Sequence, residues 1–103
     1  MSTEKQLQKV RKRIDGVDKQ IVKHVSKRLR LAILAGEIKH KSGIKFEDRK
    51  RIKEVIKNVA KESKKQKINP KVTKEIYRLL LKKFLQEQKM IGGNYIDGEK
   101  IRV

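Results

Sequence analysis

Three cationic side chains interrupt an apolar helical pattern and have the spacing to bind a small dianion. Arg28 lies on the apolar line itself, and Arg11 and Lys39 lie on the line beside it. Arg28 and Lys39 are about 16 Å apart along a helix, so their long side chains can converge on one ligand. Arg11 lies about 25 Å before Arg28 and can join such a site only from another protomer. The alternatives are solvated surface positions for Arg11 and Lys39, and a structural ion pair for Arg28.

Two further polar residues lie on apolar helix faces. Gln88 follows Phe84 by one turn, so its amide is either a satisfied structural group or a hydrogen-bond donor to a ligand. His24 is interpreted as a packed or partly exposed interior residue, because no second His, Cys or carboxylate lies at metal-ligand spacing. The chain contains no Cys and none of the common phosphate, dinucleotide or zinc motifs, so the sequence predicts no metal and no cofactor.

The apolar residues repeat at helical spacing and predict three helices of unequal length. The first is expected over residues 4–41, which corresponds to a length of about 57 Å. Its apolar residues alternate by threes and fours, as in a heptad seam that only His24 and Arg28 interrupt. The apolar members of this seam are Leu7, Val10, Ile14, Val17, Ile21, Leu31, Ala35 and Ile38.

Two shorter helices are expected in the second half of the chain. Asp48 is the expected N-cap of the first of them, which ends in the polar stretch 61–67. Asn69-Pro70 begins the last helix, which runs to about Met90 and is stopped by the glycine pair at 92–93. The side chains predicted to be buried on these helices are Ile52, Val55, Ile56, Val59, Ala60, Val72, Ile76, Leu79, Leu80 and Phe84.

The long seam cannot be covered by two shorter helices of the same chain, and apolar surface left in water costs about 25 cal/mol per Å². We therefore predict an all-α fold in which the long helices of two protomers share one seam, giving an intertwined homodimer. The predicted organisation is a helical domain over residues 1–91 and a tail over 92–103. Residues 94–103 form either a small hairpin around Asp97-Gly98 or a loosely ordered extension.

The chain is strongly basic, with 30 Lys and Arg against 12 Asp and Glu and a net charge of +18 in 103 residues. A basic helical nucleic-acid-binding protein is therefore one interpretation. The charge is spread along the chain without a basic arm, and aromatic residues for base stacking are scarce, so nucleic acid is not expected as a partner. No apolar run approaches the roughly 18 residues of a membrane span, and no secretion leader is recognised, so we expect a cytoplasmic protein.

Ordered motifs cover about residues 7–88. The first helix contains Leu7-x-x-Val10-Arg11-x-x-Ile14-Asp15-x-Val17-Asp18-x-x-Ile21-Val22 and then Arg28-x-x-Leu31-Ala32-x-x-x-Gly36-x-x-Lys39. Gly43 with Asp48-x-x-Arg51 follows, and the last helix contains Ile76-Tyr77-Arg78-Leu79-Leu80-Leu81 and Gln88. Each motif is degenerate, but their ordered combination resembles the AroQ-type, all-α chorismate mutases.

The resemblance implies a homodimer that converts chorismate to prephenate, in the part of the shikimate pathway that leads to phenylalanine and tyrosine. It implies that Arg28 and the Arg11 of a partner protomer clamp the two carboxylates of the substrate. Lys39 and Gln88 would be the catalytic donors to the ether oxygen of the breaking C–O bond. This unimolecular Claisen rearrangement needs no nucleophile, metal or cofactor, because conformational restraint and electrostatic stabilisation suffice.

The second and third helices supply the remaining residues that the resemblance assigns to substrate binding. Arg51 would add positive charge near a carboxylate, and Asp48 would contact the substrate or orient its neighbours. Ile52 replaces the usual glutamate that meets the substrate hydroxyl, and Phe84 stands where a small hydroxyl residue is common. Both also fit the apolar stripes as core residues. An isochorismate-pyruvate lyase of the same fold remains the alternative activity.

Overall fold

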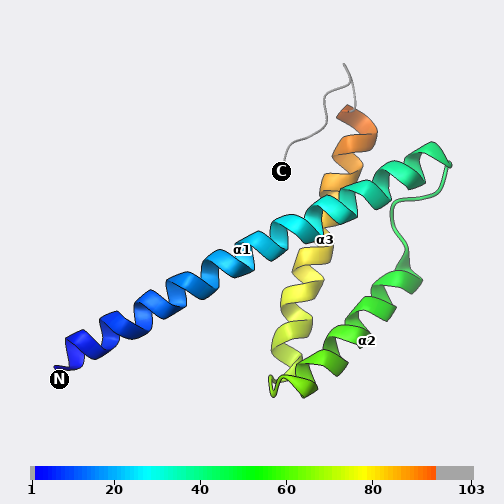
Figure 1. The fold of residues 1–103 in the computed structure, drawn as a ribbon. Coiled ribbons are helices and arrows are strands. Elements are labelled where there is room, and N and C mark those ends of the chain that lie inside the picture. Colours follow the sequence, from blue (N-terminus) through cyan, green and yellow to red (C-terminus); the bar gives the residue numbers. More distant parts are fainter. Residues whose placement is uncertain (1, 95–103) are drawn as a thin grey trace. The chain divides into compact units, whose positions relative to one another are not determined.

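The computed structural model describes residues 2–94, which form three α-helices (Figure 1). Helix α1 spans Thr3–Lys41, α2 spans Arg49–Lys65 and α3 spans Pro70–Asn94. Residues 2–94 contain no strand, so the predicted all-α class with one long and two shorter helices is confirmed. The chain divides inside α1, between Leu31 and Ala32, into two compact units. Within the described range, every helix is too polar or too short to span a lipid bilayer.

The first unit contains the α1 turns up to Leu31, and its apolar seam has no cover within that unit. Leu7, Val10, Ile14, Val17 and Ile21 are each between 47% and 57% exposed. Val10, Ile14 and Val17 line a shallow groove with Arg13 and Asp18. His24 is exposed, so the interior position expected for it is wrong for the single chain. The apolar seam predicted from the heptad spacing is therefore present, and its side chains are about half exposed.

The second unit begins with the last turns of α1, and a short loop connects them to α2. Gly43 adopts a left-handed φ of 68°, which glycine tolerates without a steric penalty. The Ile44 amide donates a hydrogen bond to the Lys39 carbonyl at 2.8 Å, which closes the end of α1. The Asp48 carboxylate accepts from the Arg51 amide at 3.0 Å, so the predicted N-cap of α2 is confirmed.

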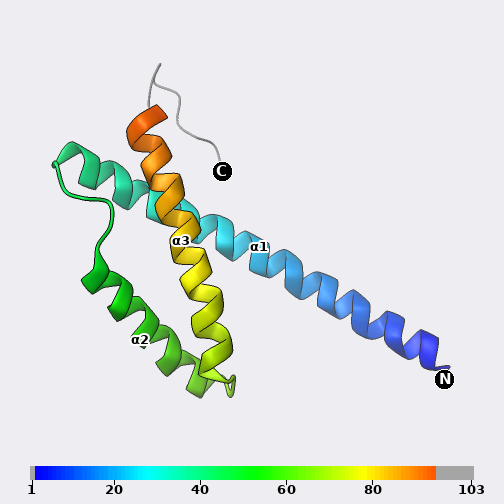
Figure 2. The same cartoon turned by 180° about the vertical axis from the view of Figure 1, so that it is seen from behind.

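Helices α2 and α3 lie side by side as an antiparallel hairpin (Figure 2). Val55 of α2 and Phe84 of α3 are buried. Near the turn, the buried Ser63 hydroxyl lies 2.7 Å from the Val59 carbonyl and 2.5 Å from the Thr73 hydroxyl. The interface between α2 and α3 thus contains both apolar and polar side chains. At the start of α3, the Asn69 side chain accepts from the Lys71 amide at 3.0 Å, as the predicted cap requires.

Two expectations for α3 are wrong. Val72, Ile76 and Leu79 are more than half exposed, because they lie on a face turned away from the one that carries Phe84. The helix continues through the glycines at 92–93 to Asn94. Glycine lowers helix stability by about 1 kcal/mol but keeps its backbone donor, so a glycine pair does not have to end a helix.

The C-terminal residues carry predictions that stay open. Apart from Asn94, which ends α3, the predicted hairpin at 94–103 lies outside the described residues. The division into a helical domain over 1–91 and a tail over 92–103 likewise stays a prediction.

Candidate active site

Gln88 is the buried polar group that ties α3 to the end of α1. Its side chain is only 7% exposed, and its Nε2 atom donates a hydrogen bond to the Ala32 carbonyl at 2.6 Å. Ala32 is itself buried, at 6% exposure. A buried amide without a partner would be destabilising, and this hydrogen bond satisfies one of its donors. The amide is therefore fixed at a defined position on the surface of α1.

Gly36 lies one turn after Ala32 and explains how α3 can approach so closely. A Cβ atom at position 36 would lie 2.9 Å from Cγ and 3.2 Å from Cβ of Gln88. These are near-backbone atoms of the glutamine, so any larger residue at position 36 would have to displace the whole side chain. Glycine costs about 1 kcal/mol inside a helix, and the contact with Gln88 gives a structural reason for it here.

Lys39 follows on the same face of α1. Ala32, Gly36 and Lys39 are spaced i, i+4 and i+7, which places them on one side of the helix. The half-buried Lys39 donates from Nζ to the Phe46 carbonyl at 3.0 Å, in the loop before α2. The His40 ring stacks on the Phe46 ring with centroids 6.2 Å apart. The loop therefore holds the lysine head group in place.

The two fixed side chains retain hydrogen-bonding capacity. A lysine ammonium has three N–H donors and a glutamine amide has two. The hydrogen bonds of Lys39 and Gln88 to the Phe46 and Ala32 carbonyls use one donor each. Each side chain therefore has donors beyond the one that its hydrogen bond to a carbonyl uses. Such an arrangement can stabilise negative charge on a ligand oxygen.

The start of α2 carries two more of the predicted site residues. Asp48 is exposed, and its carboxylate is engaged as the N-cap. Arg51 is exposed and forms an ion pair with Glu54, an interaction not predicted from the sequence. Ile52, next along α2, is half-buried. This end of α2 therefore combines a capping interaction, an ion pair and an apolar residue.

The other predicted site residues differ in their exposure. Phe84, one turn before Gln88 on α3, is 5% exposed and belongs to the core of the hairpin. In the first unit, Arg11 is exposed and Arg28 is half-buried. Within the second unit, Gln88 therefore lies against the face of α1 that carries Lys39. Arg11 and Arg28 belong to the first unit.

Two contributors to this arrangement were not predicted from the sequence. They are the Ala32 carbonyl, which anchors Gln88, and Gly36, which makes room for it. A carbonyl has no signature in a sequence, because every residue has one. A glycine in the middle of a long helix is a signal, since it is unfavourable there without a packing reason.

Residues 2–94 contain no group of three side chains placed to hold a metal ion. The side chains gathered on this face of α1 are hydrogen-bond donors and a cation. Their chemistry suits binding and electrostatic stabilisation of an anionic ligand.

Comparison with known proteins identifies the family. The family model described as chorismate mutase type II matches residues 10–89, which is more than three quarters of the chain. Neither the curated proteins nor the solved structures gave a match. The matched range includes all of α2, most of α1 and α3, and every predicted site residue. The chain therefore belongs to the chorismate mutase type II family.

Proposed function

We propose that this protein catalyses the rearrangement of chorismate to prephenate as a homodimer. The observation that carries the proposal is the buried Gln88 amide, which the Ala32 carbonyl fixes on the α1 face that also presents Lys39. Membership of the chorismate mutase type II family supports the reaction class. A Lys ammonium and a Gln amide can both donate hydrogen bonds to an oxygen that gains negative charge.

The reaction breaks one C–O bond and forms one C–C bond within the same molecule. Negative charge develops on the ether oxygen as the C–O bond lengthens, and no proton transfer to or from the protein is needed. Lys39 and Gln88 would donate hydrogen bonds to this oxygen, and both side chains are held in place before substrate arrives. Such preorganised donors stabilise a transition state more than the ground state.

The two substrate carboxylates need cations on both sides of the reacting centre. We assign this role to Arg28 and to Arg11 from the second protomer, with Arg51 adding positive charge near a carboxylate. Arg51 would have to leave or share its ion pair with Glu54, which is an exposed contact and therefore weak. Holding both carboxylates favours the compact conformer in which the reacting carbons meet.

Three further residues complete the proposed substrate site. Asp48 would contact the substrate or orient its neighbours while capping α2. Ile52 and Phe84 would meet the substrate with apolar groups, because neither can form a hydrogen bond with the substrate hydroxyl. We therefore expect weaker substrate binding than a glutamate and a small hydroxyl residue at these positions would give.

The dimer is proposed from the seam of α1. Five apolar side chains at heptad spacing remain about half exposed in the single chain, and a second copy would cover them. The same pairing would bring an Arg11 to a site from which its own chain is too far away. We place the reaction in the cytoplasm, in phenylalanine and tyrosine biosynthesis.

A substrate-depletion assay with product identification tests the proposal. The purified protein is incubated separately with chorismate and with isochorismate, and the products are identified by mass spectrometry. Prephenate from chorismate is the expected result. Pyruvate release from isochorismate without prephenate formation would assign the protein to the lyase activity of the same fold. Turnover of neither substrate would contradict an enzymatic role.

A further inference from the structure

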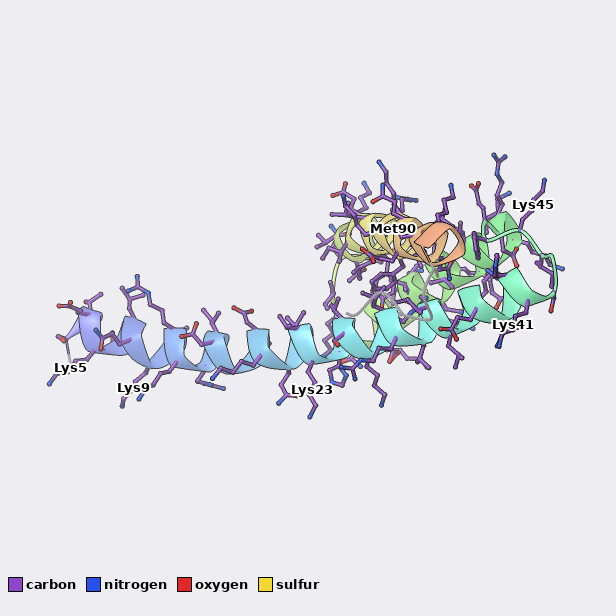
Figure 3. The ribbon with its side chains drawn as sticks, turned by 90° about the horizontal axis from the view of Figure 1, so that it is seen from above. Lys5, Lys9, Lys23, Lys41, Lys45 and Met90 are labelled. Atoms are coloured by element: carbon purple, nitrogen blue, oxygen red, sulfur yellow. The ribbon has the colours of Figure 1, made fainter. Side chains whose placement is uncertain are left out.

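One face of α1 is occupied almost entirely by cations. With a rotation of about 100° per residue, eight positions of residues 3–31 fall within an arc of about 80°. Seven are Lys or Arg and the eighth is Gly16. Figure 3 shows Lys5, Lys9 and Lys23 extending from the same side of α1. We call this set the basic face, and its exposed members are Lys5, Lys9, Lys12, Lys19, Lys23, Lys27 and Arg30.

The basic face contains no compensating carboxylate. The three acidic residues of this part of α1, Glu4, Asp15 and Asp18, lie outside the arc. Within residues 2–94, none of the seven cationic side chains is in an ion pair. Like charges four residues apart repel one another and destabilise a helix, whereas helix faces that serve only for solubility commonly mix both signs. The arrangement therefore favours a bound polyanion.

The basic face is separate from the surfaces assigned so far. It lies about 160° around the helix from the apolar seam, so it remains exposed when a second copy covers the seam. Arg11 and Arg28, the first-unit residues of the proposed active site, both fall outside the arc. The even distribution of charge along the sequence concealed this face, because the helical rotation gathers residues that are three or four positions apart.

We propose that the basic face binds the phosphate backbone of double-stranded nucleic acid. It extends about 37 Å, which matches roughly eleven base pairs of a duplex that carries one charge per 1.7 Å. Six of its seven cations are lysines, which contact phosphates as point charges and do not read bases by bidentate contacts. Binding should therefore be independent of sequence.

The composition of the face argues against other polyanionic partners. The basic face contains no aromatic side chain on which unpaired bases could stack, and residues 2–31 contain no Phe, Tyr or Trp, so a single strand is disfavoured. The face also has no apolar anchor of the kind that dominates protein interfaces. A regular polymer of phosphates needs neither feature.

The test measures binding of the full chain to a fluorescent 30-base-pair duplex between about 50 and 200 mM salt by anisotropy. If five to seven phosphates are contacted, the plot of log K against log salt has a slope of roughly −4 to −6. Two duplexes of unrelated sequence should give the same affinity within about twofold. A single strand of equal length and an anionic phospholipid vesicle are measured in parallel.

Two variants with equal charge loss locate the surface. Replacing Lys9, Lys12, Lys19 and Lys23 by Gln should weaken duplex binding more than about tenfold and reduce the slope by roughly 3 to 4. The matched control replaces four exposed lysines outside α1, namely Lys45, Lys71, Lys83 and Lys89, and should change affinity less than about threefold. Helix α2 carries a shorter row of exposed lysines, which both variants keep intact: Lys50, Lys53, Lys57, Lys61 and Lys64. Circular dichroism verifies that each variant is folded.

Three results would overturn the proposal. The first is no duplex binding at the lowest salt concentration. The second is an equal loss of affinity in the two charge-matched variants, which would mean that total charge and not this face is responsible. The third is tighter binding to the single strand or to the vesicle than to the duplex. None of these outcomes depends on chorismate turnover.

Discussion

The first three quarters of α1 and the hairpin of α2 and α3 differ in how far their apolar side chains are buried. Each carries apolar side chains at helical spacing. In the hairpin these reach buried positions such as Val55 and Phe84. Among residues 2–31 not one is buried, although the seam there is longer and more regular. The apolar side chains of the hairpin are covered by its own two helices, whereas the seam of the first unit is about half exposed. The proposed dimer would cover that seam.

The proposed function follows this division. The hairpin and the end of α1 hold the two proposed catalytic donors within one chain. The exposed stretch carries the two arginines proposed to bind carboxylates. Covering the half-exposed seam with a second copy contributes on the order of 1 kcal/mol per large side chain. Dimerisation would thus complete both the core and the site.

A charge placed in the seam should have the largest effect. Ile14→Lys should dissociate the dimer and abolish measurable chorismate turnover, because burying an unpaired ammonium costs several kcal/mol and symmetry repeats it. Val22→Lys is the control, since Val22 is 68% exposed and lies off the seam. Light scattering gives the mass and an assay gives the turnover. Retention of the dimer by the Ile14→Lys protein would contradict the assignment of the seam.

Removing either proposed catalytic donor should lower kcat by about 10²- to 10³-fold. Lys39→Ala and Gln88→Ala test the two donors separately, and Lys41→Ala serves as an exposed control on the same helix. The Lys39→Ala protein should keep its helical circular dichroism and its dimeric mass, because the lysine contributes one hydrogen bond to a loop. Near-normal turnover in both donor variants would exclude them from the reaction.

Substitution of Gly36 should act through Gln88. In Gly36→Ala the new methyl group collides with Cγ of Gln88, and the displaced amide should lower kcat by about 10- to 100-fold. Gly16→Ala is the matched control, because nothing lies within 4 Å of a Cβ there. That control should raise helix stability by roughly 0.5 to 1 kcal/mol and leave kcat unchanged. Equal kcat values for the two variants would contradict the proposal that Gly36 positions Gln88 for turnover.

The helix caps should give the smallest effects and separate stability from binding. Asp48→Ala and Asn69→Ala each remove an N-terminal capping bond of the hairpin, at a cost of about 0.5 to 2 kcal/mol in urea unfolding. Only Asp48→Ala should also raise KM for chorismate, since Asp48 alone is assigned to the substrate site. A similar rise in KM for Asn69→Ala would show that loosening of the helix, and not a lost contact, is responsible.

Periodicity and capping signals were sufficient to predict the elements of this fold. Asp48 and Asn69 marked the starts of α2 and α3 correctly, since a side-chain oxygen that satisfies free backbone donors is a local signal. The burial of Ile76 was predicted wrongly. Periodicity identifies which residues share an apolar face, but whether the same chain covers that face depends on tertiary packing.

The site residues stay a prediction. The apolar stripes left a surface position open for Lys39 and a structural role open for Gln88, and their catalytic roles came from the family resemblance. Their fixation by the Phe46 and Ala32 carbonyls could not be predicted, because backbone acceptors become available only through the local path of the chain. Gly36 offered the one usable hint, as an unfavourable residue in a helix interior.

The central claim, that each active site is built from two chains, can be tested most directly by subunit mixing. Arg11→Ala and Arg28→Ala proteins are each inactive by prediction. After verified exchange of subunits, a heterodimer should contain one intact site, so a random mixture should recover up to about a quarter of the wild-type turnover of chorismate. No recovery in a mixture shown to contain heterodimers would contradict the shared site.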